Sequence, residues 1–268
     1  MNRCFGRCSA TASPNQALNR ISEDKPDLAQ VKDIFRKGYF QSWDTARPHP
    51  LAKVYAKELS LAVDRIEPKG KRILDLGCGP GRFAIAFASS GARSVAAVDI
   101  SLAVLARARK RAEEARVVDH LLFCTGDAEE LPYRDAAFDA ISCMQTFVHF
   151  PRPERSVREM FRVCRRGGRF VATATNQNRA WVWRYPSVAT AEVLLEGFPP
   201  DLRDSVLRLA SSPAVSRALR LDMGLSAPHR GFTMPAFSRL FTAAGFEVEE
   251  ETSIGRPAVF FLVSGRKP

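Results

Sequence analysis

Residues 72–83 read RILDLGCGPGRF, and this stretch decides the fold. Its first half is mostly apolar, as a buried parallel strand requires: Ile73, Leu74 and Leu76. Its second half has a glycine at every second position: Gly77, Gly79 and Gly81. A backbone without Cβ atoms can turn sharply there and approach a ligand closely. Because residues 83–89 read as the start of a helix, the strand, turn and helix together predict a nucleotide-type site.

The spacing of these glycines distinguishes between classes of nucleotide site. A dinucleotide-binding turn has the pattern G-x-G-x-x-G, and its third glycine would fall where this chain has Arg82. The spacing therefore argues against NAD. The run D-x-G-x-G-x-G that begins at Asp75 instead resembles motif I of the class I S-adenosylmethionine-dependent methyltransferases. A turn that is rich in glycine by chance is the alternative, to be weighed against the rest of the chain.

Three later stretches match the same family in the same order. Residues 94–98 form a second apolar run that ends at Asp99, about 20 residues past the glycines, where an acid can bind ribose hydroxyls. Residues 126–141 read GDAEELPYRDAAFDAI and resemble the family's GDAxxLPxxDxxFD segment. Residues 165–171 read RRGGRFV and match the family's turn into its fifth strand. The resemblance covers residues 71–175 well and is loose outside that range.

The resemblance implies that the cofactor is S-adenosyl-L-methionine and that S-adenosyl-L-homocysteine is the product. Asp75 and the glycine turn would hold the methionine end, Asp99 would hold the ribose, and Asp127 would face the adenine amine. The end of the fourth strand would lie beside the methyl group. The candidate cofactor-binding residues are Asp75, Gly77, Cys78, Gly79, Gly81, Asp99, Ile100, Asp127, Ala128, Met144 and Gln145.

Strands and helices are expected to alternate, which predicts an α/β protein with a parallel sheet. Strands are predicted over residues 72–76, 94–99, 120–125, 140–144 and 169–174. Helices are predicted over residues 51–66, 102–115 and 154–164, the last of them ended by Gly167 and Gly168. The resemblance implies a Rossmann-like, seven-stranded, mostly parallel sheet with helices on both faces. Its last elements would be a helix over residues 234–244 and strands over 246–252 and 258–264, the seventh strand antiparallel.

The ends of the chain add to this core. Residues 1–26 read as a flexible tail, and residues 27–268 as one methyltransferase domain. Residues 27–66 would form N-terminal lid helices, and residues 178–231 a helical substrate cap inserted after strand five. Packing of the aromatic side chains against the core is the alternative role for the lid region. The candidate substrate-binding residues are Tyr39, Trp43, Trp181 and Arg184.

His149 is the candidate general base, because an unperturbed imidazole titrates near about pH 6.5 and the residue follows the fourth strand. A structural histidine that caps the next turn is the alternative, and His49 and His229 are weaker rivals. No metal site is expected. The ligand set of metal-dependent catechol methyltransferases is missing near strands four and five, and the pair Cys4 and Cys8 has no further ligands nearby.

Composition limits the setting in which the protein works. No run of 18 apolar residues is present, so no spanning helix is expected. The six cysteines are not spaced as a disulfide framework, which favours a reducing, cytoplasmic location. The acid-free first 20 residues carry Arg3, Arg7 and Arg20 and are also compatible with an organellar transit peptide. The net charge of +11 permits an anionic substrate, contact with an anionic membrane surface or nucleic acid, and does not choose among them.

We therefore expect an enzyme that methylates the oxygen, carbon or nitrogen of an aromatic, quinone-like or lipidic small molecule. It resembles the ubiquinone and menaquinone biosynthesis methyltransferases. An RNA methyltransferase that uses the basic surface is one alternative, although residues 143–151 lack the Asn/Asp-Pro-Pro-Tyr/Phe motif of amino-directed nucleic-acid methyltransferases. A cofactor-binding regulator without catalysis is another. The acceptor and the oligomeric state do not follow from the sequence.

Overall fold

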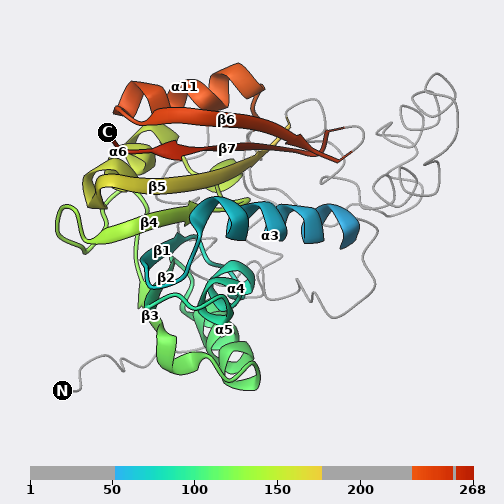
Figure 1. The fold of residues 1–268 in the computed structure, drawn as a ribbon, viewed down its shortest axis with the longest axis vertical. Coiled ribbons are helices and arrows are strands. Elements are labelled where there is room, and N and C mark those ends of the chain that lie inside the picture. The colour runs from blue at the N-terminus through green and yellow to red at the C-terminus, as the bar shows by residue number, and fades with distance from the viewer. Residues whose placement is uncertain (1–51, 177–230, 256–257) are drawn as a thin grey trace, which may run out of the picture.

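The computed structural model describes residues 52–176, 231–255 and 258–268 (Figure 1). Within these ranges the elements are α3 (Ala52–Ile66), β1 (Arg72–Leu76), α4 (Arg82–Ser89), β2 (Ser94–Asp99), α5 (Leu102–Glu114), η1 (Val118–His120), β3 (Leu121–Thr125), β4 (Phe138–Cys143), η2 (Phe147–His149), α6 (Pro153–Val163), β5 (Cys164–Thr175), α11 (Met234–Ala244), β6 (Glu247–Ile254) and β7 (Phe260–Arg266). The tail, residues 27–51 of the expected lid and residues 178–230 of the expected cap lie outside the described residues.

The strands form one seven-stranded sheet in the order β3-β2-β1-β4-β5-β7-β6. The five strands β3, β2, β1, β4 and β5 pair with one another in parallel. Strand β7 runs antiparallel to both β5 and β6. The strand order reverses between β1 and β4. From β1 the chain continues to β2 on one side of this point, and from β4 it continues to β5 on the other side. The predicted mostly parallel sheet with an antiparallel seventh strand is confirmed.

Helices cover both faces of this sheet, as predicted. Helices α3, α4 and α5 lie on one face, and α6 and α11 lie on the other (Figure 1). Successive residues of a strand point to opposite faces, so Ile73 packs in the core under α3 and α4, while Leu74 packs in the core under α6 and α11. Strand β1 is therefore buried on both faces of the sheet, which explains why its sequence is mostly apolar.

The core under α6 and α11 is rich in phenylalanine. Phe170 of β5 stacks on Phe241 of α11, with ring centroids 4.6 Å apart and an angle of 8° between the rings. Phe147 of η2 meets Phe237 of α11 edge to face, with ring centroids 5.0 Å apart. Both arrangements are favourable for aromatic quadrupoles. The contact of Phe147 anchors η2, and with it the segment that follows β4, in the core.

The predicted boundary between the helix over residues 154–164 and the fifth strand was wrong. We expected Gly167 and Gly168 to separate a helix from the fifth strand, but α6 ends at Val163 and β5 begins at Cys164. The pairing with β4 runs from Phe138–Cys164 directly to Ala140–Arg169, so the glycines form an irregularity inside the strand. A Cβ atom on Gly168 would lie 2.7 Å from Sγ of Cys164. The glycines therefore permit a tight strand irregularity and do not stop the helix.

No helix within the described ranges has the length and apolar character needed to cross a bilayer.

Candidate functional site

The candidate cofactor residues gather at one edge of the sheet. Strands β1, β2, β3 and β4 are parallel neighbours, so the segments that follow their carboxyl ends meet beside the point where the strand order reverses. Ligands of open α/β sheets bind in the crevice at such a reversal. The candidate cofactor residues occupy four motif segments, at residues 75–81, 99–100, 127–128 and 144–145, which lie at or just after the ends of these strands.

The glycine turn is held by its neighbours on both sides. The backbone N–H groups of Gly77 and Cys78 donate to the carbonyl of Val98 in β2, at 2.8 and 3.0 Å. On the other side, Oγ1 of Thr146 donates to the carbonyl of Gly77 at 3.2 Å. A Cβ atom on Gly77 would lie 2.2 Å from Cγ2 of Thr146, so only glycine allows this approach.

Gly79 has the opposite surroundings. Its φ is +53°, and apart from its two neighbours in the chain no heavy atom of the described residues lies within 4 Å of the position that a Cβ would take. The backbone is therefore open on that side, as a ligand that rests against it would need. Gly77 thus allows a close contact with Thr146 within the protein, whereas Gly79 leaves open space at the site.

Asp99 is fixed by the turn that it faces. Its Oδ2 accepts a 3.0 Å hydrogen bond from the N–H of Gly79, and its Oδ1 accepts a 2.9 Å hydrogen bond from the N–H of Ser101. Burial raises the pKa of Asp99, and the N–H donors of Ser101 and Gly79 oppose that increase. Each carboxylate oxygen has more than one acceptor position, so the oriented carboxylate can still accept hydrogen bonds from two ligand hydroxyls.

Asp75, at the end of β1, is almost wholly buried, with 1% of its surface exposed. Among the described residues, none forms a hydrogen bond with its Oδ2 atom. Burial raises the pKa of Asp75 to about 7, while the Ser142 hydroxyl, the Ala84 N–H and the Arg82 charge oppose the increase. A buried carboxyl oxygen without a partner is costly. It is therefore suited to a cationic ligand group such as an ammonium.

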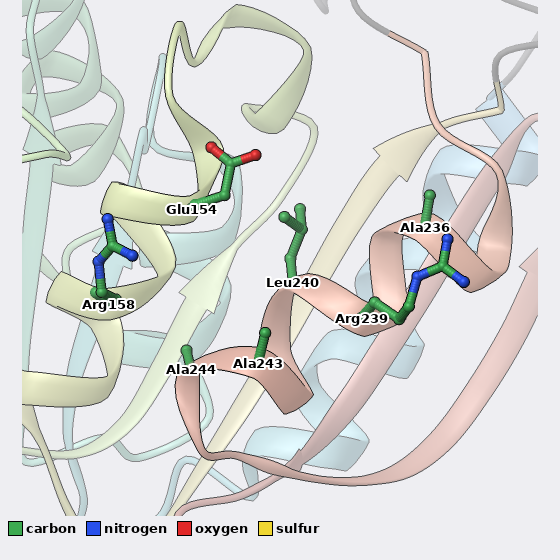
Figure 2. Close-up of a pocket in the computed structure, with 7 residues that line it drawn as sticks. All are labelled: Glu154, Arg158, Ala236, Arg239, Leu240, Ala243 and Ala244. Atoms are coloured by element: carbon green, nitrogen blue, oxygen red, sulfur yellow. The ribbon is translucent and has the colours of Figure 1, made fainter.

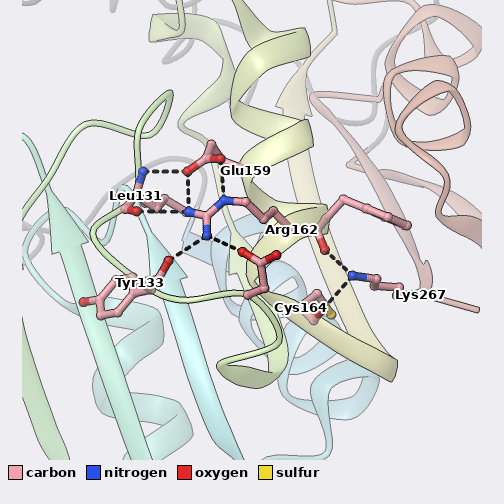
Figure 3. A network of polar contacts seen from close by, with 8 residues as sticks. Leu131, Tyr133, Glu159, Arg162, Cys164 and Lys267 are labelled. Carbon is pink, nitrogen blue, oxygen red and sulfur yellow. Dashed lines mark hydrogen bonds and ion pairs between the residues drawn. The ribbon is translucent and has the colours of Figure 1, made fainter.

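The loop between β3 and β4 carries Asp127 and Ala128. The Oδ1 atom of Asp127 accepts from the N–H of Glu129 at 3.0 Å, which shapes the local turn. Further along, Arg162 of α6 ties the loop down by donating to the carbonyls of Tyr133 and Leu131, at 2.7 and 3.1 Å (Figure 3). Helix α6, which follows β4 in the chain, therefore holds in place the loop that precedes β4.

The segment after β4 contains the remaining candidates. Met144 is buried, and Gln145 has a φ of +56°, which is rare for a residue other than glycine. Half-buried His149 ends η2, and its backbone N–H donates to the carbonyl of Thr146 at 2.9 Å. The Thr146–Gly77 contact places this segment directly against the glycine turn. The candidate substrate residues Tyr39, Trp43, Trp181 and Arg184, and the rival bases His49 and His229, lie outside the described residues.

One residue at this edge, Glu58, is not among the candidates that the sequence indicates. Glu58 of α3 is fully buried, and its carboxylate binds Arg82 at the start of α4 and Thr173 of β5, both at 2.7 Å. Its position was predictable, because Glu58 lies one helical turn before Leu61 and Ala62 on the apolar face of α3. Its partners were not, because they lie far away in the sequence.

A separate groove of about 290 Å³ lies between α6 and α11 (Figure 2). Leu240 and Ala243 project from α11 toward α6, which contributes Glu154 and Arg158. None of the residues that line it belongs to the four motif segments, so this groove is not part of the candidate site. Within the described residues, no group of three or more His, Cys, Asp or Glu side chains is arranged to hold a metal ion.

Comparisons with known proteins agree with this geometry. Residues 74–172 match the family described as "Methyltransferase domain". The chain is 31% identical over 217 residues to 27-O-demethylrifamycin SV methyltransferase of Amycolatopsis mediterranei (strain S699), a match that covers 74% of this chain and 78% of that protein. It is 28% identical over 189 residues to the ubiquinone biosynthesis O-methyltransferase of Coxiella burnetii (strain RSA 331 / Henzerling II), covering 70% and 76%.

Among solved structures, magnesium protoporphyrin IX methyltransferase (ChlM) of Synechocystis PCC 6803 with bound SAH superposes with a TM-score of 0.64. The match covers 90% of this chain and 100% of that one, at 16% sequence identity. At this identity the likeness establishes a shared fold, whereas the relationship itself rests on the sequence matches.

Proposed function

The chain belongs to the S-adenosylmethionine-dependent methyltransferase family, and we propose that it methylates a small-molecule acceptor on oxygen, carbon or nitrogen. The observation that carries this proposal is the match to the rifamycin methyltransferase, which extends over 78% of that protein and so reaches beyond the cofactor motifs. That relative and the ubiquinone O-methyltransferase are both named for small-molecule methylation. We infer an acceptor of aromatic, quinone-like or lipidic character.

The residues present fit S-adenosylmethionine, which supplies a methyl group on a positively charged sulfur. The Oδ2 atom of Asp75 has no partner among the described residues and suits the ammonium of the methionine end. Gly79 is open where that end would rest, and the carboxylate of Asp99 is oriented to accept from the ribose hydroxyls. We propose that the cofactor is held by Asp75, Gly77, Cys78, Gly79, Gly81, Asp99, Ile100, Asp127, Ala128, Met144 and Gln145.

We assign the proton-removing step to His149. Methyl transfer to a hydroxyl or amine leaves the acceptor with a proton to lose, and an imidazole can accept it near neutral pH. The position of His149, shortly after β4 and in a segment packed on the glycine turn, supports this role. We further propose that Tyr39, Trp43, Trp181 and Arg184 contact the acceptor, with Arg184 binding an anionic group of it.

A cytoplasmic location is part of the same proposal. It is supported by the cysteines of the described ranges, which are free thiols: Cys78, Cys124, Cys143 and Cys164. Free thiols are usual in a reducing compartment.

The proposal is tested with S-adenosylmethionine that carries a labelled methyl group, the purified protein and a native cell extract. The products are separated into lipid, small-molecule, RNA and protein fractions, with Asp99→Ala as the blank. Label in the lipid or small-molecule fraction is the expected result. Label that appears only in RNA or protein would overturn the small-molecule assignment, and binding of the cofactor without label in any fraction would count against transfer.

A further inference from the structure

A buried acidic side chain on α3 joins three other elements of the fold. Glu58 has no exposed surface, and Nη2 of Arg82 donates to its Oε2 at 2.7 Å. Oγ1 of Thr173 donates to its Oε1 at 2.7 Å, and Nε2 of Gln145 also donates to Oε2. These partners lie 24, 115 and 87 residues away in sequence, so the carboxylate is a junction between distant segments.

The pair formed by Glu58 and Arg82 is largely buried, with 22% of the Arg82 side chain exposed. The Arg82 guanidinium lies 4.2 Å from the ring centroid of Phe83 and 5.1 Å from that of Tyr55. Its Nη1 atom donates to the carbonyl of Tyr55 at 3.2 Å. Burial raises the pKa of Glu58, and the charge of Arg82 together with the hydrogen bonds opposes this increase. A buried carboxylate is tolerated only when it is well paired, and even then its burial is costly. A role at the neighbouring site would explain why an acidic residue occupies this position.

Gln145 supplies that explanation. It adopts a left-handed backbone conformation, with a φ of +56°, that costs free energy in a residue with a Cβ atom. The side-chain amide of Gln145 donates to Glu58, and its backbone N–H donates to Oγ1 of Thr173 at 3.0 Å. Because Thr173 donates in turn to Glu58, both the side chain and the backbone of Gln145 are held by the same carboxylate.

We propose that Glu58 is a positioning residue for methyl transfer, which holds Gln145 in its left-handed conformation. The left-handed turn places Thr146 against Gly77, so the carboxylate sets how the segment after β4 meets the glycine turn. This inference rests on the proposed function, in which Met144 and Gln145 help to hold the cofactor, and on the expectation that the end of the fourth strand lies beside the methyl group. It makes α3 part of the active-site framework.

The first test compares Glu58→Gln with Glu113→Gln, a control at an exposed carboxylate on α5. The variant keeps the shape of the side chain but removes its charge and turns one acceptor into a donor. We expect turnover in the labelled-methyl assay to fall by about tenfold or more, while the affinity for S-adenosylhomocysteine stays within about threefold and the control is unchanged. Unchanged turnover of Glu58→Gln would overturn the proposal.

A second test separates positioning from general damage to the fold. Glycine adopts a positive φ without strain, so Gln145→Gly removes the need for Glu58 to hold the turn. On that background, Glu58→Gln should lower turnover by less than about threefold. An equal loss on both backgrounds would show that Glu58 acts by another route. If Glu58→Gln does not fold, Thr173→Val takes its place, and Thr173→Ser, which keeps the hydroxyl, should restore the wild-type rate.

A third test does not depend on activity. The ¹³Cα and ¹³Cβ chemical shifts of Gln145 report its backbone conformation in the full chain. They should show the left-handed state in the wild type and a move away from it in Glu58→Gln. Unmoved shifts would overturn the positioning role even if no acceptor is ever methylated, so failure of this inference can be told apart from failure of the proposed function.

Discussion

The backbone N–H of Gly79 donates a 3.0 Å hydrogen bond to Oδ2 of Asp99, so the glycine turn after β1 and the acid after β2 form one unit. The carboxylate is therefore oriented before any ligand arrives, and the turn is held in the shape that leaves Gly79 open. Preorganisation of this kind reduces the free energy that binding must spend on ordering the site.

Removing the charge of Asp99 should weaken cofactor binding. Hydrogen bonds to a charged group contribute about 1.5–3 kcal/mol each, so we expect Asp99→Asn to raise the Kd for S-adenosylhomocysteine by about 10- to 100-fold. Isothermal titration calorimetry measures the change, and Asp119→Asn, at an exposed carboxylate of η1, is the control. A Kd within about twofold of the wild-type value would exclude Asp99 from the binding site.

Asp75 should make cofactor binding depend on pH. Its pKa is raised to about 7, so in the ligand-free protein the carboxyl is largely protonated below that pH. An ammonium ligand pairs with the ionised form, so binding in acid must release the proton, and affinity should fall by up to about tenfold per pH unit below 7. Calorimetry across this range measures the slope. Asp75→Asn should lose it, and parallel profiles for the two proteins would contradict the assignment.

The same pKa shift has a consequence for the stability of the ligand-free protein. The folded-state pKa of Asp75 lies above its ordinary value of 3.8, so the folded protein binds the proton more tightly than the unfolded chain does. The stabilising contribution of the protonated carboxyl is therefore complete below pH 3.8 and is lost as the pH rises to about 7. Denaturation midpoints for wild type and Asp75→Asn should diverge across this window.

Replacing His149 should affect turnover and leave cofactor binding alone. Positioned general bases contribute about 10²–10⁴-fold to a rate, so we expect His149→Ala to lower turnover by about 10²-fold or more. Single-turnover assays with labelled S-adenosylmethionine measure the rate, and His120→Ala, at an exposed histidine of η1, is the control. An unchanged rate would remove His149 from the mechanism.

Arg162 should stabilise the loop that carries Asp127 and Ala128. It donates to two loop carbonyls and pairs with Glu159 at 2.7 Å, and Glu159 itself accepts from the N–H of Leu131 at 2.8 Å (Figure 3). Arg162→Gln leaves these groups poorly matched, so we expect a loss of about 1–3 kcal/mol in the free energy of unfolding. Urea denaturation measures it, with exposed Arg134→Gln as the control.

The loss caused by Arg162→Gln should shrink in acid. The hydrogen bond from Arg162 lowers the pKa of Glu159, so the carboxylate contributes stability that is present above its unfolded-state pKa and is lost as the pH falls through its folded-state pKa. A destabilisation that is equal at neutral and acid pH would contradict this account.

The boundaries of several elements were predictable because local chemistry marks them. Strands β1 and β2 and helix α11 were predicted with the bounds that the structure has. Helix α11 begins after Thr233, whose side chain accepts from the N–H of Ala236 at 3.3 Å, and ends before Gly245, which has a φ of +104°. Side-chain caps and a left-handed glycine are local signals that a sequence shows directly.

Other features depended on contacts between distant segments. A pair of glycines ordinarily marks a boundary, and only the pairing of β5 with β4 shows that Gly167 and Gly168 lie within a strand. Glu58 lies on a predictable face, but what makes its burial tolerable is a set of partners on α4, β4–η2 and β5. The cofactor edge was therefore predictable from motifs, whereas the framework that supports it was not.

The place of β7 has a consequence for how the protein is made. Strand β7 is the last strand in the chain, yet it lies between β5 and β6, and β6 pairs with no other strand of the described sheet. Strand β6 is synthesised before β7. At ~5–20 residues per second, β6 therefore has no strand to pair with for about a second. The sheet from β3 to β5 can therefore form before β7 is made, and until β7 is inserted β5 is the open edge of that sheet while β6 has no strand to pair with.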